Sequence, residues 1–122
     1  MNTLELLLKA DRPNMPEKEI KLKRLSKACG GDVIFKLRAL SYNRVAEIKD
    51  SHTGKDMDVH IILAGVTSPD LKSEDLKQKY NAVTPAEMVK TMLLPGEIED
   101  ISREIEKLSG FRIATIEEVK KK

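Results

Sequence analysis

The sequence predicts a single α+β domain that is predominantly α, with an N-terminal two-stranded β-hairpin followed by a bundle of about five short helices. Three observations support this fold class. Apolar and polar residues alternate through much of residues 18–40, which is the period of a strand. Apolar residues then recur every three or four positions over residues 41–110, which is the period of a helix. With 122 residues, the chain is long enough for one domain with a modest core.

The first 17 residues predict a short helix and a linker. The segment TLELLLK at residues 3–9 is helical in pattern, and Thr3 is its expected N-cap. The following ADRPNMP contains two prolines and predicts a linker. The segment lacks a basic n-region and a small-residue cleavage site, and no apolar run in the chain approaches the roughly 20 residues that span a bilayer. We therefore expect neither a signal peptide nor a membrane partner.

The β-hairpin is predicted over residues 18–40. Ile20 and Leu22 define the buried face of the first strand, and the sequence CGGD at residues 29–32 supplies glycines for a tight turn. The second strand shows the strict alternation of Val33, Phe35, Leu37 and Ala39 against Ile34, Lys36 and Arg38. A helical turn over residues 24–29 is an alternative that the pattern leaves open.

The helical part is predicted over residues 41–110. Ser41 is the expected N-cap of a helix over residues 42–50. A second helix over 56–65 carries an apolar face and is closed by Gly65, and a turn follows. The face of that second helix is formed by Val59, Ile62, Leu63 and Val66.

Three more helices follow. The first runs from Ser73 to about Tyr80, and Thr84-Pro85-Ala86-Glu87 is a strong start for a helix that reaches about Leu94. Pro95-Gly96 then forms a corner, and the last helix extends to Ser109 before Gly110. Residues 111–122 form a C-terminal tail with a frayed helix expected from Thr115.

Side chains suited to catalysis or metal binding are sparse. The candidate zinc ligands are the two histidines, His52 and His60, together with Asp56 and Asp58. Zinc requires three or four ligands, so the histidines alone do not suffice. The two aspartates suit a helix N-terminus instead. Cys29 is the single cysteine, which fits a reducing cytoplasm, and no histidine stands near it to activate the thiol. The sequence therefore predicts no enzyme, no cofactor and no metal.

Charge is unevenly distributed, although the net charge is only +2. A basic run contains Lys18, Lys21, Lys23, Arg24 and Lys27, and an acidic run contains Glu97, Glu99, Asp100, Glu104 and Glu106. Solvated faces are the common explanation of such runs. Electrostatic docking through the basic run, within one molecule or between copies, is the alternative. A nucleic-acid-binding adaptor built on the basic hairpin is disfavoured, because aromatic residues are 3% of the chain and do not cluster.

The last helix carries an apolar stripe, defined by Ile98, Ile101, Ile105 and Leu108. Such a narrow stripe either packs in the core against the preceding helix or forms a seam for a partner helix. The core is the commoner outcome, but a role in binding stays open. The candidate partner-binding residues are Val89, Met92, Leu93, Ile98, Ile101, Ile105, Leu108 and Phe111.

The order of these motifs resembles the tail assembly chaperones of long-tailed phages and defective prophages, specifically the XkdN-like group of Gram-positive hosts. The resemblance covers essentially the whole chain. It is carried by KRLSKACGGDVIFKLRALS at 23–41, GVTSPDL at 65–71 and KYNAVTPAEMVKTMLLPGEIEDISREIEKLSGF at 79–111. The Leu-Leu-Pro-Gly-Glu-Ile segment with the following Ile-Glu-Lys-Leu-Ser-Gly-Phe is the most distinctive part.

The resemblance implies a small, mostly helical cytoplasmic protein of the bacterial host cell. It implies binding to the tape measure protein, which the chaperone keeps soluble, recruitment of tail tube subunits, and absence from the finished virion. Self-association and a longer product made by ribosomal frameshift are also implied. The run Lys120–Lys122 suits slippery codons, or is simply a solvated basic tail. A structural tail component is the remaining alternative.

Overall fold

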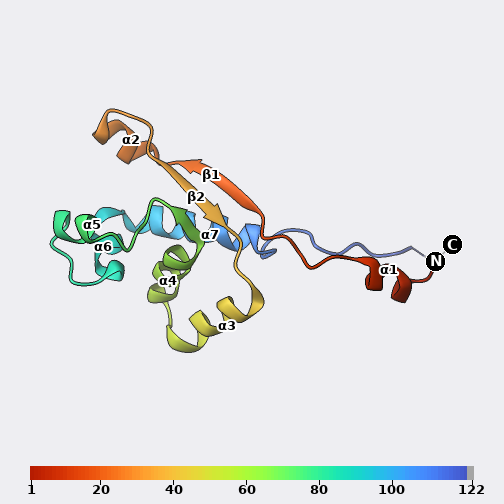
Figure 1. The fold of residues 1–122 in the computed structure, drawn as a ribbon. Coiled ribbons are helices and arrows are strands. Elements are labelled where there is room, and N and C mark those ends of the chain that lie inside the picture. The colour runs from red at the N-terminus through yellow and green to blue at the C-terminus, as the bar shows by residue number, and fades with distance from the viewer. Residues whose placement is uncertain (121–122) are drawn as a thin grey trace.

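A computed structural model describes residues 1–120, so Lys121 and Lys122 of the basic tail lie outside the described residues. Within the described part, seven helices and three strands follow one another as in Figure 1. Their bounds are α1 Thr3–Lys9, β1 Glu17–Lys21, α2 Lys23–Cys29, β2 Ile34–Arg38, α3 Tyr42–Ser51, α4 Lys55–Gly65, β3 Val66–Ser68, α5 Glu74–Lys79, α6 Pro85–Met92 and α7 Pro95–Leu108.

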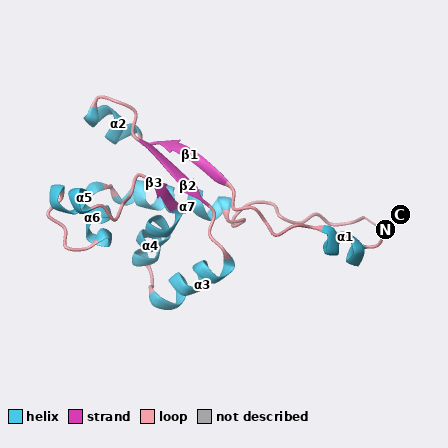
Figure 2. Ribbon diagram, in the orientation of Figure 1, coloured by secondary structure: helices cyan, strands magenta, loops and turns pink. Residues whose placement is uncertain are grey.

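The strands form one antiparallel sheet in the order β1-β2-β3, and this arrangement corrects the predicted fold class (Figure 2). The hairpin exists, with Glu17 opposite Arg38 and Lys21 opposite Ile34. However, the strands are three rather than two, and they are interspersed among the helices. A helix, α2, lies inside the hairpin connection, and β3 lies between α4 and α5. The prediction of a hairpin followed only by helices is therefore wrong.

Helix α2 begins directly after Leu22, which is extended and buried, and the helix itself buries Leu25 and Ser26 against the body. The Ser26 hydroxyl accepts a hydrogen bond from the Val33 N–H at 2.8 Å, which ties the helix to the start of β2. Gly30 adopts a φ of 70° at the C-cap. The glycines thus end a helix rather than form a tight hairpin turn, and the helical alternative for residues 24–29 is the correct one.

Strand β3 escaped prediction because it has only three residues, too few to show alternation. Val66 was assigned to the apolar face of the preceding helix. In the structure, helix α4 ends at Gly65, and Val66 pairs with Leu37 of β2 instead. The same buried valine thus belongs to the sheet.

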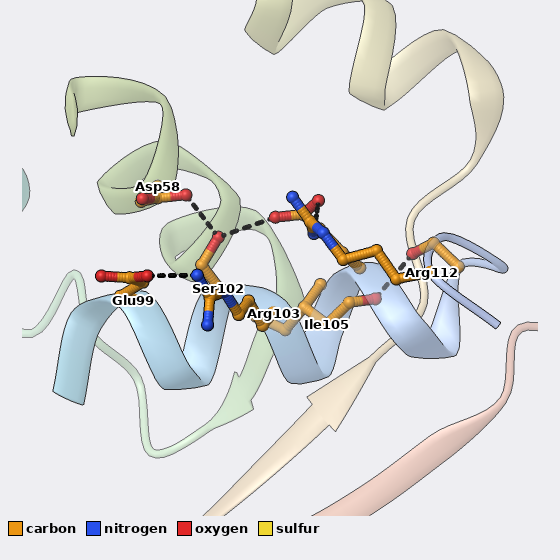
Figure 3. Close-up of polar contacts among 8 residues, drawn as sticks. Asp58, Glu99, Ser102, Arg103, Ile105 and Arg112 are labelled. Atoms are coloured by element: carbon orange, nitrogen blue, oxygen red, sulfur yellow. Dashed lines mark hydrogen bonds and ion pairs between the residues drawn. The ribbon is translucent and has the colours of Figure 1, made fainter. Parts of the chain in front are cut away.

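Helices α4 and α7 pack against each other and cover one face of the sheet. Their contact is close because Gly65 of α4 meets Ile105 of α7 without an intervening side chain. Fully buried Ser102 donates its hydroxyl hydrogen bond to Asp58 of α4 at 2.8 Å (Figure 3). The core around this contact contains Phe35, Leu37, Ile62, Met88, Val89, Ile101 and Ile105.

The helix starts follow the predicted capping, with one exception. Ser41 caps α3 and Thr84 caps α6, as expected. At α1 the cap is Asn2, whose side chain accepts the Glu5 N–H at 2.9 Å, and not Thr3. The Pro95-Gly96 corner is confirmed, because α6 ends at Met92 and α7 begins at Pro95.

The two ends of the chain project from the body in the same direction (Figure 1). Helix α1 has no buried residue. Residues 114–120 have no regular secondary structure, so the helix expected from Thr115 is wrong. None of the helices within residues 1–120 combines the length and the apolar character needed to cross a bilayer.

Candidate functional site: a charged groove beside helix α7

A groove of 470 Å³ lies between the hairpin and α7, and it brings together the two charged runs of the sequence. We call it the hairpin groove. One wall comes from β1 and α2, and the other comes from α7. Its lining residues are Lys18, Ile20, Lys21, Leu22, Lys23, Arg24, Glu97, Asp100, Ile101 and Glu104. The walls therefore carry opposite charges, with apolar side chains between them.

Two ion pairs join the walls. The Lys18 ammonium lies 2.7 Å from the Glu104 carboxylate, and the Arg24 guanidinium lies 2.8 Å from that of Glu97. Lys18 donates a hydrogen bond that lowers the pKa of Glu104 below its usual range, against the opposing effect of burial. Both pairs are partly exposed to solvent, so each contributes modestly to stability.

Arg24 also determines the geometry of the corner between α6 and α7. It donates to the Met92 carbonyl oxygen at 2.9 Å, at the end of α6, as well as to Glu97 at the start of α7. Glu97 in turn accepts the Leu94 N–H at 2.7 Å. Burial opposes ionisation of Glu97, but the hydrogen bonds from Arg24 and Leu94 outweigh it, so its pKa lies below the ordinary value.

The floor of the hairpin groove is apolar. Leu22 and Ile101 are buried there, and Ile20 is half-buried. Ile101 lies on α7 between Glu97 and Glu104, so the two ion pairs flank it along the helix. On the rim, Lys23 and Asp100 are exposed and form no ion pair with any residue in 1–120. These two side chains are free to contact another molecule.

Four of the five residues predicted for electrostatic docking line this groove, namely Lys18, Lys21, Lys23 and Arg24. Lys27 lies on α2 outside it. Lys21 forms its ion pair with Asp32 at 3.0 Å and not with α7. The apolar members Ile20 and Leu22 were assigned only to a buried strand face. In the sequence, the acidic run was the signal that indicated the residues of the opposite wall.

The structure buries most of the residues predicted to bind a partner. Val89, Met92, Leu93, Ile101 and Ile105 are in the core. Ile98 and Leu108, at the two ends of the stripe, are half-buried, and Phe111 is 39% exposed. A partner reaches the buried members only if the packing around α7 opens. A binding role for the set stays a prediction.

The two histidines form a stacked pair, with ring centroids 3.4 Å apart. Burial lowers the pKa of His60, and the neighbouring His52 lowers it further. Among residues 1–120, no three His, Cys, Asp or Glu side chains are grouped as metal ligands would be. Cys29 is exposed at the end of α2.

The fold and the groove thus define a small α+β domain with a groove whose walls carry opposite charge and whose floor is apolar. The chain belongs to the phage XkdN-like tail assembly chaperone (TAC) family, whose sequence profile matches residues 4–121. The protein is accordingly a tail assembly chaperone with protein partners in tail assembly.

The fold is also similar to that of a crystal structure titled as the protein yqbn, a structural genomics target. The two share 21% sequence identity with a TM-score of 0.71, over 91% of this chain and 98% of that one. At this identity the similarity extends to the fold alone. No curated protein matches the chain.

Proposed function

We propose that this chaperone binds the tape measure protein, keeps it soluble and helps to recruit tail tube subunits. It acts in the cytoplasm of the bacterial host, without catalysis, and is absent from the finished virion. Membership of the tail assembly chaperone family supports this proposal. The observation that carries it furthest is the hairpin groove, because its walls have opposite charge and its floor is apolar.

Such a groove suits an amphipathic helix. A helix of this kind presents an apolar stripe flanked by charged side chains, and both signs of charge find a complement here. Lys23 offers a free cation on one rim, and Asp100 offers a free anion on the other. By contrast, α7 places Glu97, Asp100 and Glu104 opposite the basic run, which disfavours binding of a polyanion such as nucleic acid.

The ion pairs across the groove make binding reversible. Lys18–Glu104 and Arg24–Glu97 are partly exposed, so water and a charged partner compete with them at small cost. Their opening uncovers Ile101, the buried α7 residue in the floor of the groove. The half-buried ends of the stripe, Ile98 and Leu108, lie outside the lining of the hairpin groove, as does Phe111, so their role in partner binding is a separate part of the proposal. Weak and exchangeable contacts of this kind suit a chaperone.

Coexpression with the tape measure protein of the same gene cluster tests this proposal. We expect the chaperone to keep that protein in the soluble fraction and to co-purify with it. Lys23→Glu and Asp100→Lys, which reverse the two free rim charges, should each weaken the association about tenfold. Lys27→Glu is the matched control, since it makes the same charge change on α2 outside the groove. Equal effects of Lys23→Glu and Lys27→Glu would reject the groove as the site.

Mass spectrometry of purified particles separates a chaperone from a structural tail component. We expect no peptide of this chain in the finished virion, and its presence at tail stoichiometry would make it structural. For the longer frameshifted form, the gene should carry a slippery heptamer near the codons for Lys120–Lys122 and an overlapping downstream frame.

A further inference from the structure

A second groove lies beside α3, away from the hairpin groove, and none of its residues is shared with that site. We call it the α3 groove. It has a volume of 280 Å³. Its apolar lining includes Leu40, Val45, Met57, Ile61 and Phe111. At its edge, the Lys49 ammonium lies 5.2 Å from the centre of the Phe111 ring and forms no ion pair with any residue in 1–120.

Helix α1 has an apolar face without a partner. Leu4, Leu7 and Leu8 lie at i, i+3 and i+4, which places them on one side of the helix. They are 64%, 67% and 76% exposed. Glu5 stands beside this face, and Leu6 points to the other side of the helix. A helix of seven residues is marginal in water by itself, so it gains stability wherever this face is buried.

The linker that carries α1 is anchored beside the α3 groove. The Pro16 carbonyl accepts the Ala39 N–H at 2.9 Å, and the next residue, Leu40, lines the groove. Residues 10–15 connect this anchor to α1 and span about 20 Å when extended. A segment on such a short tether has an effective concentration in the millimolar range. It therefore outcompetes an untethered chain of similar affinity.

We propose that α1 docks into the α3 groove of its own chain and closes it. The leucine face, Leu4, Leu7 and Leu8, covers the apolar lining, and Glu5 comes to lie near Lys49. Length of the tether, apolar match and charge complementarity all favour this occupant. The docked conformation occupies a surface separate from the hairpin groove, so it stands or falls independently of tape measure binding.

Disulfide trapping in the purified full chain tests the proposal. A Cys29→Ser background carries Leu7→Cys on α1 and Val45→Cys in the groove, at low micromolar concentration under mild oxidation. We expect a reducible link within one molecule. The matched control is Leu7→Cys with native Cys29, which is exposed at the tip of the hairpin. The link to residue 45 should form at least about tenfold faster than the control link.

A rate no higher than that of the control would overturn the proposal. Links formed only between molecules would overturn it as well, and they would identify the occupant as a second copy.

Hydrogen exchange provides a test that needs no engineered cysteine. Leu7→Asp places a charge on the leucine face, and the amides of α3 around Val45 should then exchange about fivefold faster. Leu6→Asp is the control, because the same charge is placed on the opposite side of α1. Unchanged exchange in Leu7→Asp, or equal acceleration in both variants, would contradict docking through the leucine face.

Discussion

Gly65 of α4 lies directly against the side chain of Ile105 in α7. A methyl group added at Gly65 would lie 2.7 Å from both Cδ1 and Cγ2 of Ile105, well inside van der Waals contact. Because α4 and α7 form the central helical contact of the core, this pair sets how closely the two helices approach.

Gly65→Ala should therefore lower the free energy of unfolding by about 1–3 kcal/mol, since neither helix can retreat without disturbing the core. Gly96→Ala is the control, because Gly96 lies in the first turn of α7 with nothing within 4 Å of an added Cβ. That variant should be neutral or slightly stabilising. Urea denaturation of both variants checks the prediction. Equal stability of the two would show that the contact is not tight.

Glu97→Ala should lower the free energy of unfolding by about 1–2 kcal/mol, because it removes the acceptor of both Leu94 N–H and Arg24. Glu99→Ala is the control on the same helix. Within residues 1–120, Glu99 pairs with Arg103 alone, on an exposed face, and its loss should cost less than about 0.5 kcal/mol. Thermal melts at neutral pH measure the difference. A cost for Glu99→Ala as large as that for Glu97→Ala would contradict the proposed role of the corner.

Stability should fall as the pH is lowered through the range in which histidine titrates. The pKa of His60 is lowered in the folded state from an ordinary value of 6.5. The unfolded chain thus binds a proton more readily, so this part of the stability is full above about 6.5 and is lost as the pH falls toward the folded pKa. Burial is the main cause of the lowered pKa of His60, and His52, Lys90 and Arg44 also oppose its charged form, whereas Asp56 favours it.

Urea titrations at a series of pH values measure this effect. His60→Asn should flatten the loss of stability that otherwise sets in as the pH falls below about 6.5. A control variant, His52→Asn, keeps the half-buried His60 but removes the imidazole stacked on it, so it should reduce the slope only in part. An unchanged slope in His60→Asn would show that the dependence arises elsewhere.

Ile101→Ala should cost about 2–5 kcal/mol in the free energy of unfolding, because the side chain is 1% exposed and leaves a cavity under the hairpin. Leu94→Ala removes a leucine that is 52% exposed, at the N-cap position immediately before α7, and should cost less than about 1 kcal/mol. The denaturation midpoints of the two variants, at unchanged m-values, give the two losses of stability. A small loss of stability in Ile101→Ala would indicate that the apolar stripe of α7 forms an interface and not part of the core.

The helices were predictable where caps and periodicity coincide. Thr84-Pro85 with Glu87, and the stripe of α7, both correspond to helices of nearly the expected length. The sheet was harder. Leu22 and Leu25 satisfy a strand and a helix pattern at once, and Val66 satisfies both the face of α4 and the pairing with Leu37. In each position tertiary contacts decide between local patterns that are equally good, and a sequence does not contain those contacts explicitly.

The sequence predicted only part of the hairpin groove, because the groove also depends on long-range contacts. The two charged runs are visible in the sequence, and complementary docking within one molecule was one of the alternatives. However, their pairing depends on residues 73 and 86 positions apart, Arg24 with Glu97 and Lys18 with Glu104. The α3 groove had no sequence signal, because Leu40, Met57 and Phe111 belong to separate segments.

The separation in sequence between the hairpin and α7 has a consequence for folding during synthesis. The hairpin of β1 and β2 leaves the ribosome early, but the helix that packs beside it and supplies Glu97 and Glu104 is translated after all the other described helices. Contacts between such distant segments form slowly, and the apolar face of the hairpin stays uncovered until then. We therefore expect the nascent chain to complete its core only after α7 has emerged from the ribosome.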